Sequence, residues 1–207
     1  MLRLHDYLPS GNGYKARLVL AQLGRPFELV EYDITRGETR TPAFLSRVSA
    51  NGRIPVLELE DGRLLPESNA ILWYLGDGTG LLSADGFERA ETLQWMCFEQ
   101  YSHEPNIATV RFWLTHATID LSGWRRELLA EKRAMGEAAL GVMERHLASR
   151  TFFVGERYSI ADVALYAYTH VAGEGGFDLA PYAAVRAWLA RVAEQPAHVP
   201  ITWRPGD

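Results

Sequence analysis

The fold is decided by one stretch, Asn51-Gly-Arg-Ile-Pro-Val-Leu-Glu-Leu-Glu-Asp-Gly-Arg-Leu-Leu-Pro-Glu-Ser68. Residues 56–59 alternate apolar and acidic side chains, as a half-buried strand does, and Asp61-Gly62 is a hairpin signal before a return strand at Leu64. Pro55 stands at the start of the first strand, where a missing N–H costs least. The stretch therefore predicts an antiparallel hairpin that starts at residue 56.

The residues on either side of this hairpin are suited to holding a ligand. The Ile54–Pro55 bond is a candidate for the cis isomer, which is cheap only before proline, and that isomer would leave the Ile54 N–H and C=O free to pair with an extended peptide. Ser68 precedes apolar residues at helical spacing, so it stands at a helix N-terminus, where free N–H groups and the helix dipole favour a carboxylate. We therefore expect this region to bind a short, charged peptide.

Length and composition exclude several classes of protein. The chain has 207 residues, a hydrophobic content of 47% and a net charge of −5, which argues against a nucleic-acid partner. It contains no apolar run near the roughly 20 residues of a membrane span, and we expect neither a membrane span nor a signal peptide. Cys97 is the only cysteine and the six histidines have no ligand spacing, so we expect no disulfide and no metal site. A reducing cytoplasm is the simplest location.

The order of elements before residue 78 predicts a thioredoxin-like domain. A short strand at residues 2–9 is followed by a helical pattern from Gly13 that stops at Gly24-Arg-Pro26, and then by a strand at residues 27–32. Such a β–α–β unit favours a parallel pair with a right-handed crossover. A short helix opened by Thr41-Pro42, the hairpin and the helix after Ser68 complete a β-α-β-α-β-β-α order. We therefore assign residues 1–78 to an α/β thioredoxin-like domain.

The remainder of the chain predicts helices only. Residues 76–86 have a linker composition, and residues 87–117 form one long helical stretch that should bend near Pro105. Residues 124–147 and 182–194 are further helices, and Ser159-Ile-Ala-Asp162 is a capping box that starts another. Cys97 is expected to be buried and inert. We therefore assign residues 86–207 to an all-α domain.

The first strand-to-helix turn, Tyr7-Leu-Pro-Ser-Gly-Asn-Gly-Tyr-Lys15, is the expected place of the chemistry. Within it, Gly11-x-Gly13-x-x-Ala16 formally matches a dinucleotide-binding fingerprint. That motif needs a larger parallel sheet than this order of elements provides. A flexible loop, with Asn12 and Gly13 in a left-handed turn, is a second alternative.

Over essentially its whole length the chain resembles the cytosolic glutathione transferases. The motifs that carry the resemblance are Ser10-Gly-Asn-Gly-Tyr-Lys15, Asn51-Gly-Arg-Ile-Pro55, Glu67-Ser68-Asn-Ala-Ile71 and Ser159-Ile-Ala-Asp162. The resemblance implies a cis proline at Pro55, whose neighbour Ile54 pairs through its backbone with the cysteinyl part of glutathione. It also implies that Glu67 and Ser68 hold the γ-glutamyl carboxylate. Arg53 either pairs with a carboxylate of the tripeptide or is an ordinary exposed arginine.

The first turn resembles the serine-type and nu-like bacterial members of this family. In those, a Ser or Thr and often an Asn two residues on approach the glutathione sulfur, and Ser10 and Asn12 match them. A hydroxyl and an amide N–H aimed at one sulfur favour the thiolate, and so lower the thiol pKa from about 8.5. Gly13 departs from the relatives that carry Cys or Ser there, so no mixed disulfide can form at that position. Tyr7 is the rival hydroxyl, as in tyrosine-type classes.

The resemblance implies an enzyme that activates glutathione, its co-substrate, for attack on a small hydrophobic electrophile, as in detoxification. The same site acting on disulfides or peroxides is a variant, and a non-catalytic binding or dimerisation module is the alternative. Four side chains on residues 87–117 could line an apolar pocket for the electrophile, namely Tyr101, His103, Phe112 and Trp113. The alternative is that each of them, at helical spacing, simply belongs to the core. The family also implies a homodimer, with the first domain of one subunit against residues 87–117 of the other.

Overall fold

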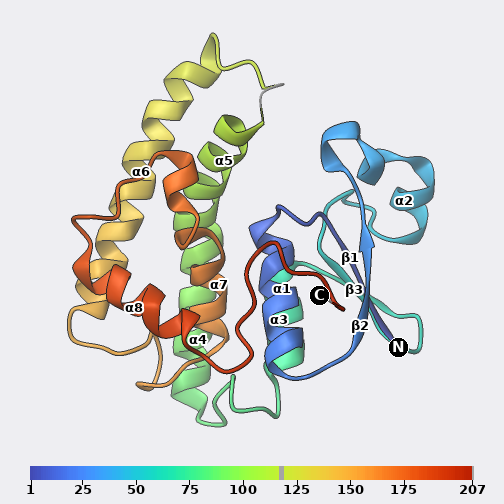
Figure 1. Ribbon diagram of the computed structural model, residues 1–207, viewed down its shortest axis with the longest axis horizontal. Coiled ribbons are helices and arrows are strands. Elements are labelled where there is room, and N and C mark those ends of the chain that lie inside the picture. The colour runs from blue at the N-terminus through green and yellow to red at the C-terminus, as the bar shows by residue number, and fades with distance from the viewer. Residues whose placement is uncertain (117–118, 207) are drawn as a thin grey trace. The chain divides into compact units, whose positions relative to one another are not determined.

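A computed structural model of the protein describes residues 1–116 and 119–206 and divides the chain into two compact units (Figure 1). The second unit runs from Leu81 to Gln195, and the first contains residues 1–80 together with the segment that begins at Pro196. We call residues 196–206 the return segment. The all-α domain expected from the sequence ran to residue 207, so the structure differs by assigning the return segment to the first unit.

The first unit is built on a four-stranded sheet with the order β2-β1-β3-β4. The strands are β1 (Leu2–Asp6), β2 (Phe27–Glu31), β3 (Val56–Glu58) and β4 (Leu64–Pro66). β1 and β2 are parallel, whereas β3 is antiparallel to both β1 and β4. This is the thioredoxin-like arrangement that the order of elements predicts.

Two helices of this unit carry the residues of interest. They are α1 (Gly11–Gln22) and α3 (Ser68–Gly76), which pack against each other on one side of the sheet (Figure 1). The helix α2 (Pro42–Arg47) starts as predicted, because Thr41 accepts a hydrogen bond from the Phe44 N–H and Pro42 occupies the first turn. The single-turn helices η1 (Ile34–Arg36) and η2 (Glu38–Arg40) precede it.

The predicted hairpin is present, with a loop one residue longer than the two-residue signal. The Leu59 N–H donates to the Arg63 carbonyl at 2.8 Å, and the Gly62 N–H donates to the Leu59 carbonyl at 2.9 Å. Gly62 has φ +83°, which a glycine adopts without a steric cost. A turn followed by a left-handed residue is the usual three-residue hairpin loop, so residues 60–62 form the loop.

The second unit contains helices that surround one fully buried helix. Its helices are α4 (Gly86–Phe98), α5 (Glu104–Thr115), α6 (Trp124–Leu147), α7 (Ile160–Thr169) and α8 (Ala183–Ala193), with the short η4 (Ala172–Gly175). Every residue of α7 is buried, and it packs against α4, α5 and α8. A helix that is apolar on all sides must lie in a core, which makes α7 the centre of this all-α unit.

The long helix expected at residues 87–117 is interrupted close to Pro105. A π-helical segment, η3 (Glu99–His103), separates α4 from α5, and Pro105 lies in the first turn of α5. Proline has no N–H to donate to the preceding turn, so the regular series of helical hydrogen bonds is interrupted there. The Asn106 side chain donates to the Ser102 carbonyl at 2.7 Å. The π-helical segment therefore lies where the sequence predicted a bend, whereas the expected end at Ala117 lies outside the described residues.

The predicted capping box at the start of α7 is also confirmed. The Asp162 carboxylate accepts hydrogen bonds from the Ser159 N–H and hydroxyl, and the Ala161 N–H donates to the Ser159 hydroxyl. Two residues distant in sequence also donate to this carboxylate, namely Phe153 through its N–H and Trp188 through its indole N–H. Asp162 therefore ties three segments of the second unit together.

The expectation that Cys97 is buried is wrong. Trp95 and Met96 turn toward the interior of the second unit, and Cys97, the next residue along α4, is exposed. Successive residues of a helix point about 100° apart, so burying two neighbours leaves the third outside. None of the helices in residues 1–116 and 119–206 combines the length and apolar character needed to cross a bilayer.

Candidate functional site

Ser10 is the N-cap of α1. Its hydroxyl oxygen accepts a hydrogen bond from the Gly13 N–H at 3.3 Å, and its own N–H donates to the Tyr7 carbonyl at 2.8 Å. Within the part of the chain that the structure describes, the hydroxyl proton of this half-buried side chain has no acceptor. Ser10 can therefore donate a hydrogen bond to a ligand at the positive end of α1.

Gly13 lies against the carboxylate of Asp6. A Cβ at this position would stand 1.6 Å from Asp6 Oδ1, far inside any allowed contact. No side chain fits at Gly13 while Asp6 keeps its place, which gives a physical reason for a glycine at this position. The first turn of α1 thus packs directly on the end of β1.

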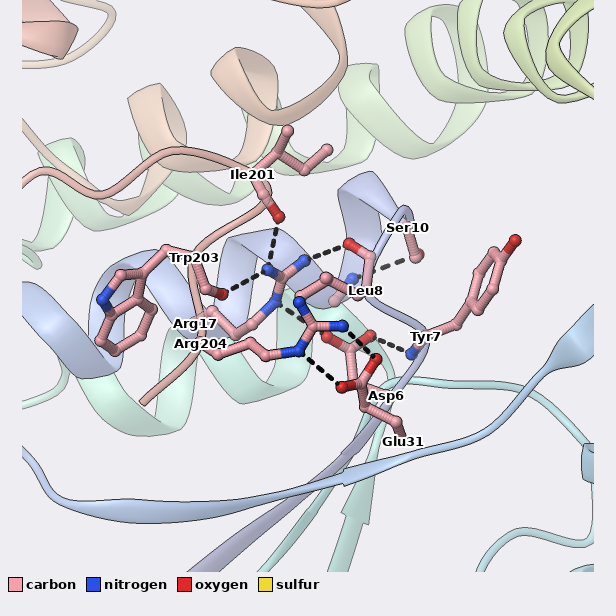
Figure 2. A network of polar contacts seen from close by, with 10 residues as sticks. Asp6, Tyr7, Leu8, Ser10, Arg17, Glu31, Ile201, Trp203 and Arg204 are labelled. Atoms are coloured by element: carbon pink, nitrogen blue, oxygen red, sulfur yellow. Dashed lines mark hydrogen bonds and ion pairs between the residues drawn. The ribbon is translucent and has the colours of Figure 1, made fainter. Parts of the chain in front are cut away.

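Asp6 is fully buried and holds the backbone of this turn. Its Oδ1 accepts from the Tyr7 N–H at 2.7 Å, and its Oδ2 accepts from Arg17 Nε at 2.9 Å. Burial raises the pKa of Asp6 to about 6, although the Arg17 guanidinium and the Tyr7 N–H both favour the carboxylate. The ring of Tyr7, the rival hydroxyl, extends away from Asp6 and Arg17 (Figure 2).

Asn12 and Ser68 are in contact although 56 residues separate them. The Ser68 hydroxyl donates to Asn12 Oδ1 at 3.2 Å and accepts from the ammonium group of Lys15 at 3.3 Å. Lys15 and Ser68 are both buried. The structure thus brings the first turn of α1 and the N-terminus of α3 together.

Sequence reasoning did not single out Lys15. The signal was a lysine in the Ser10–Lys15 motif, one helical turn after Gly11. Burying an ammonium group is costly unless it has polar partners, so its position beside Ser68 indicates a role in this polar cluster.

Glu67 has the backbone conformation of a constrained site. Its φ is +74° and its ψ is 116°, a region that costs a residue with a side chain about 1–3 kcal/mol. It links β4 directly to α3, and its carbonyl accepts the Ile71 N–H at 2.9 Å. Its side chain is exposed. Strain of this kind gathers at ligand sites, which favours the predicted use of this position.

The Ile54–Pro55 bond is cis, as predicted. Val56 pairs with Pro66 across β3 and β4, so Ile54 and Pro55 lie beside the residues that open α3. Among the described residues neither the N–H nor the C=O of Ile54 is bonded to another group of the protein. A peptide backbone is the natural partner for such a pair. Arg53 is exposed, which is consistent both with a contact to a carboxylate of the tripeptide and with an ordinary surface arginine.

The four side chains proposed for an electrophile pocket all lie in the second unit, in different environments. Tyr101, in the π-helical segment, is 87% exposed, whereas His103 is fully buried with its Nε2 2.8 Å from the Thr169 hydroxyl. Phe112 and Trp113 are half-buried on α5; the ring of Phe112 lies tilted against His116, and Trp113 packs edge to face with Trp124. Tyr101 and His103 therefore face different surroundings, although only one residue separates them.

The described residues contain no group of three or more His, Cys, Asp or Glu side chains placed to hold a metal ion.

Comparison with known proteins identifies both halves of the chain. Residues 9–77 match the family model described as glutathione S-transferase, N-terminal domain, and residues 106–196 match the model of the C-terminal domain. A glutathione S-transferase from Pseudomonas fluorescens Pf-5 is 50% identical and has a TM-score of 0.92, with 97% of this chain and 98% of that chain covered.

Two further relatives bear on the ligand and the chemistry. A glutathione transferase family member from Pseudomonas fluorescens Pf-5, solved with two glutathione bound, is 30% identical with a TM-score of 0.81, covering 95% of this chain and 89% of that one. The disulfide-bond oxidoreductase YfcG of Escherichia coli K12 is 32% identical over 201 residues, covering 92% of this chain and 90% of the relative. On its fold, its two domain matches and these relatives, the chain is a member of the glutathione S-transferase family.

Proposed function

We propose that this protein binds glutathione and activates its thiolate for attack on a small hydrophobic electrophile. The observation that carries the proposal is the hydrogen bond between Asn12 and Ser68. It joins the first turn of α1, whose polar groups can bind a sulfur, to the N-terminus of α3, which can bind a carboxylate. Ser10 would donate its free proton to the sulfur, and Asn12 would act beside it. Hydrogen bonds to the thiolate lower the pKa of the bound thiol, so no strong base is needed.

The remaining contacts follow from charge complementarity. Glutathione carries a γ-glutamyl residue with both a carboxylate and an ammonium group. The Ser68 hydroxyl and the N-terminus of α3 suit the carboxylate, with Lys15 as a nearby positive charge. The resemblance implied that Glu67 also holds this carboxylate, but its side chain is itself acidic and therefore suits the ammonium group. The unbonded backbone groups of Ile54 would pair with the cysteinyl residue, and Arg53 with the glycyl carboxylate.

A variant of the proposal uses the same site to reduce disulfides or peroxides. The name of the Escherichia coli relative, a disulfide-bond oxidoreductase, favours the disulfide reaction. In disulfide reduction two glutathione thiols are oxidised to one disulfide while the substrate disulfide becomes two thiols. The electrons come from glutathione, so the absence of a cysteine at Gly13 does not prevent the reaction. Measuring glutathione-dependent turnover on aryl halides, epoxides, peroxides and mixed disulfides separates these activities. No turnover on any of these substrates would favour the non-catalytic module.

We expect Ser68→Ala and Glu67→Gln each to weaken glutathione binding by about 1–3 kcal/mol, because each leaves a charged group of the ligand without its partner. Titration calorimetry measures the change. Ser46→Ala, which removes a hydroxyl from the exposed face of α2, and Glu60→Gln in the hairpin loop are matched controls that should keep the wild-type affinity. Unchanged affinity in both site variants would contradict the proposed orientation of glutathione.

We also propose that the protein is cytoplasmic, because a chain with one cysteine suits a reducing compartment. We propose further that it forms a homodimer, as the family resemblance implies. Three residues spaced four apart on α4 and η3 are exposed, namely Leu93, Cys97 and Tyr101. Such a stripe lies on one face of a helix and suits burial by a second copy. We expect a dimer by sedimentation at micromolar concentration, a monomer for Leu93→Arg, and no change for Met135→Arg on α6. A monomeric wild-type protein would contradict this part.

A further inference from the structure

Arg17 lies at the centre of a polar network at the base of the Ser10 turn (Figure 2). Its fully buried guanidinium donates to Asp6 at 2.9 Å, to the Leu8 carbonyl at 2.6 Å, and to the Ile201 and Trp203 carbonyls at 2.6 and 3.1 Å. A guanidinium is planar and its donors point in fixed directions, so it sets the positions of its acceptors relative to one another. Arg17 thereby joins the end of β1, the loop before Ser10 and the return segment.

Other contacts hold the return segment independently of Arg17. The Tyr14 hydroxyl donates to the Val199 carbonyl at 2.7 Å, and the ring of Trp203 packs on Phe27. Arg204 forms an exposed ion pair with Glu31 at 2.9 Å. These contacts reach α1 and the edge strand β2, and Figure 1 shows the segment running back beside α1. The return segment is thus an ordered part of the first unit.

The loop that ends at Ser10 is held at two backbone groups. Asp6 holds the Tyr7 N–H and Arg17 holds the Leu8 carbonyl, while Ser10 is joined back to Tyr7 through its own N–H. We propose that the return segment, acting through Arg17 as a positioning residue, fixes the Ser10 hydroxyl for its work on the glutathione sulfur. This inference rests on the proposed function.

The physical reason lies in how the guanidinium is satisfied. The carbonyls of Ile201 and Trp203 take donors of Arg17 that would otherwise bind water, and they keep water away from the buried pair with Asp6. Hydrogen bonds in such a low-dielectric environment are stronger and more directional. Without these two carbonyls, Arg17 would hold the Leu8 carbonyl less firmly, and Ser10 would then be less precisely positioned. An error of about 1 Å in a reacting group lowers a rate by up to about a hundredfold.

The first test replaces Arg17 by lysine, which keeps a positive charge beside Asp6 but cannot reach three segments at once. We expect kcat/KM with glutathione to fall about tenfold or more, and the apparent pKa of the bound thiol to rise, with glutathione affinity nearly kept. In a Ser10→Ala background the same change should have no further effect on either quantity, because Arg17 acts only through Ser10. Additive losses would overturn the proposal and leave Arg17 a residue of general stability.

The second test loosens the return segment in the full chain and leaves Arg17 in place. Trp203→Ala/Arg204→Ala removes the contacts with Phe27 and Glu31. Arg3→Ala is the matched control, because Arg3 forms a similarly exposed ion pair with Glu28 at 2.8 Å on the same sheet. We expect backbone amides of residues 7–13 to exchange with solvent about tenfold faster in the double variant and unchanged in the control. The double variant should also show the raised thiol pKa.

The two readouts separate failure of this inference from failure of the proposed function. Unchanged amide exchange in the double variant would overturn the inference even if glutathione is turned over normally. Faster exchange with an unchanged thiolate would overturn it too, since the segment would then order the loop without positioning the reaction. A wild-type protein that binds no glutathione would contradict the proposed function, and the exchange data would still decide whether the return segment holds the loop.

Discussion

Ser10→Ala is expected to lower kcat/KM roughly tenfold to a thousandfold, the range for removing one oriented donor to an anion. Ser10 is the N-cap of α1 and its proton is available to a ligand, so its loss removes a hydrogen bond that favours the thiolate. The apparent pKa of bound glutathione should rise while its affinity is nearly kept. The measurement is the ultraviolet thiolate band of bound glutathione, titrated against pH.

Two further variants decide which hydroxyl serves the sulfur. Asn12→Ala should act in the same direction as Ser10→Ala but more gently. Tyr7→Phe is the control, because the Tyr7 residue is tied to Asp6 through its backbone N–H while its ring extends away from the Asp6–Arg17 pair (Figure 2). If Tyr7→Phe abolished the thiolate band and Ser10→Ala left it intact, the assignment to Ser10 would be wrong.

Asp162→Ala should destabilise the protein by about 3–5 kcal/mol, because it removes an acceptor from several buried donors at once. The carboxylate accepts from Ser159, from the Phe153 N–H at 3.1 Å and from the Trp188 indole at 2.9 Å, and it is fully buried. Urea unfolding measures the change. Asp178→Ala, which removes an exposed carboxylate bonded to one backbone N–H, should cost less than about 1 kcal/mol. A similar loss in both variants would contradict the role given to Asp162.

The pH dependence of this effect has a definite sign. Burial raises the pKa of Asp162 to about 6, outweighing the donors from Trp188, Phe153 and Ser159 that favour the carboxylate. Because the pKa of Asp162 is higher in the folded than in the unfolded protein, protonation of this group stabilises the fold. That stabilisation is complete below about pH 4. That contribution is lost as the pH rises through about 6. The stability gap between wild type and Asp162→Asn should therefore narrow by about 3 kcal/mol from pH 4 to pH 7.

Local signals in the sequence predicted most of the fold. The hairpin followed from Asp61-Gly62, the start of α7 from the capping box at Ser159, and α6 from helical spacing across residues 124–147. The cis bond before Pro55 was also expected. Each of these features depends on groups a few residues apart, whose geometry hardly changes with the rest of the protein.

The sequence misled in two situations. One is a helix without distinct polar and apolar faces, and the other is a residue whose exposure depends on which side of its helix packs inward. Cys97 was expected to be buried from its apolar neighbours, but the choice of which face of α4 packs inward exposes it. In α1 every residue from Gly13 to Leu20 is buried, including Lys15 and Arg17, so no polar face marked the helix and the roles of these two cations went unseen. Periodicity distinguishes an inner from an outer face only when a helix has both.

The sequence by itself determined the elements, their order, the family, and the residue types of the candidate site. Only the tertiary structure decided that Ser68 meets Asn12 and Lys15, and that Arg17 bonds carbonyls 184 and 186 residues further along the chain. The reason is physical. Short-range hydrogen bonds are encoded by spacing, whereas the partners of a buried charge are whichever groups the packed chain brings within reach, and a pattern along the sequence does not contain that distance.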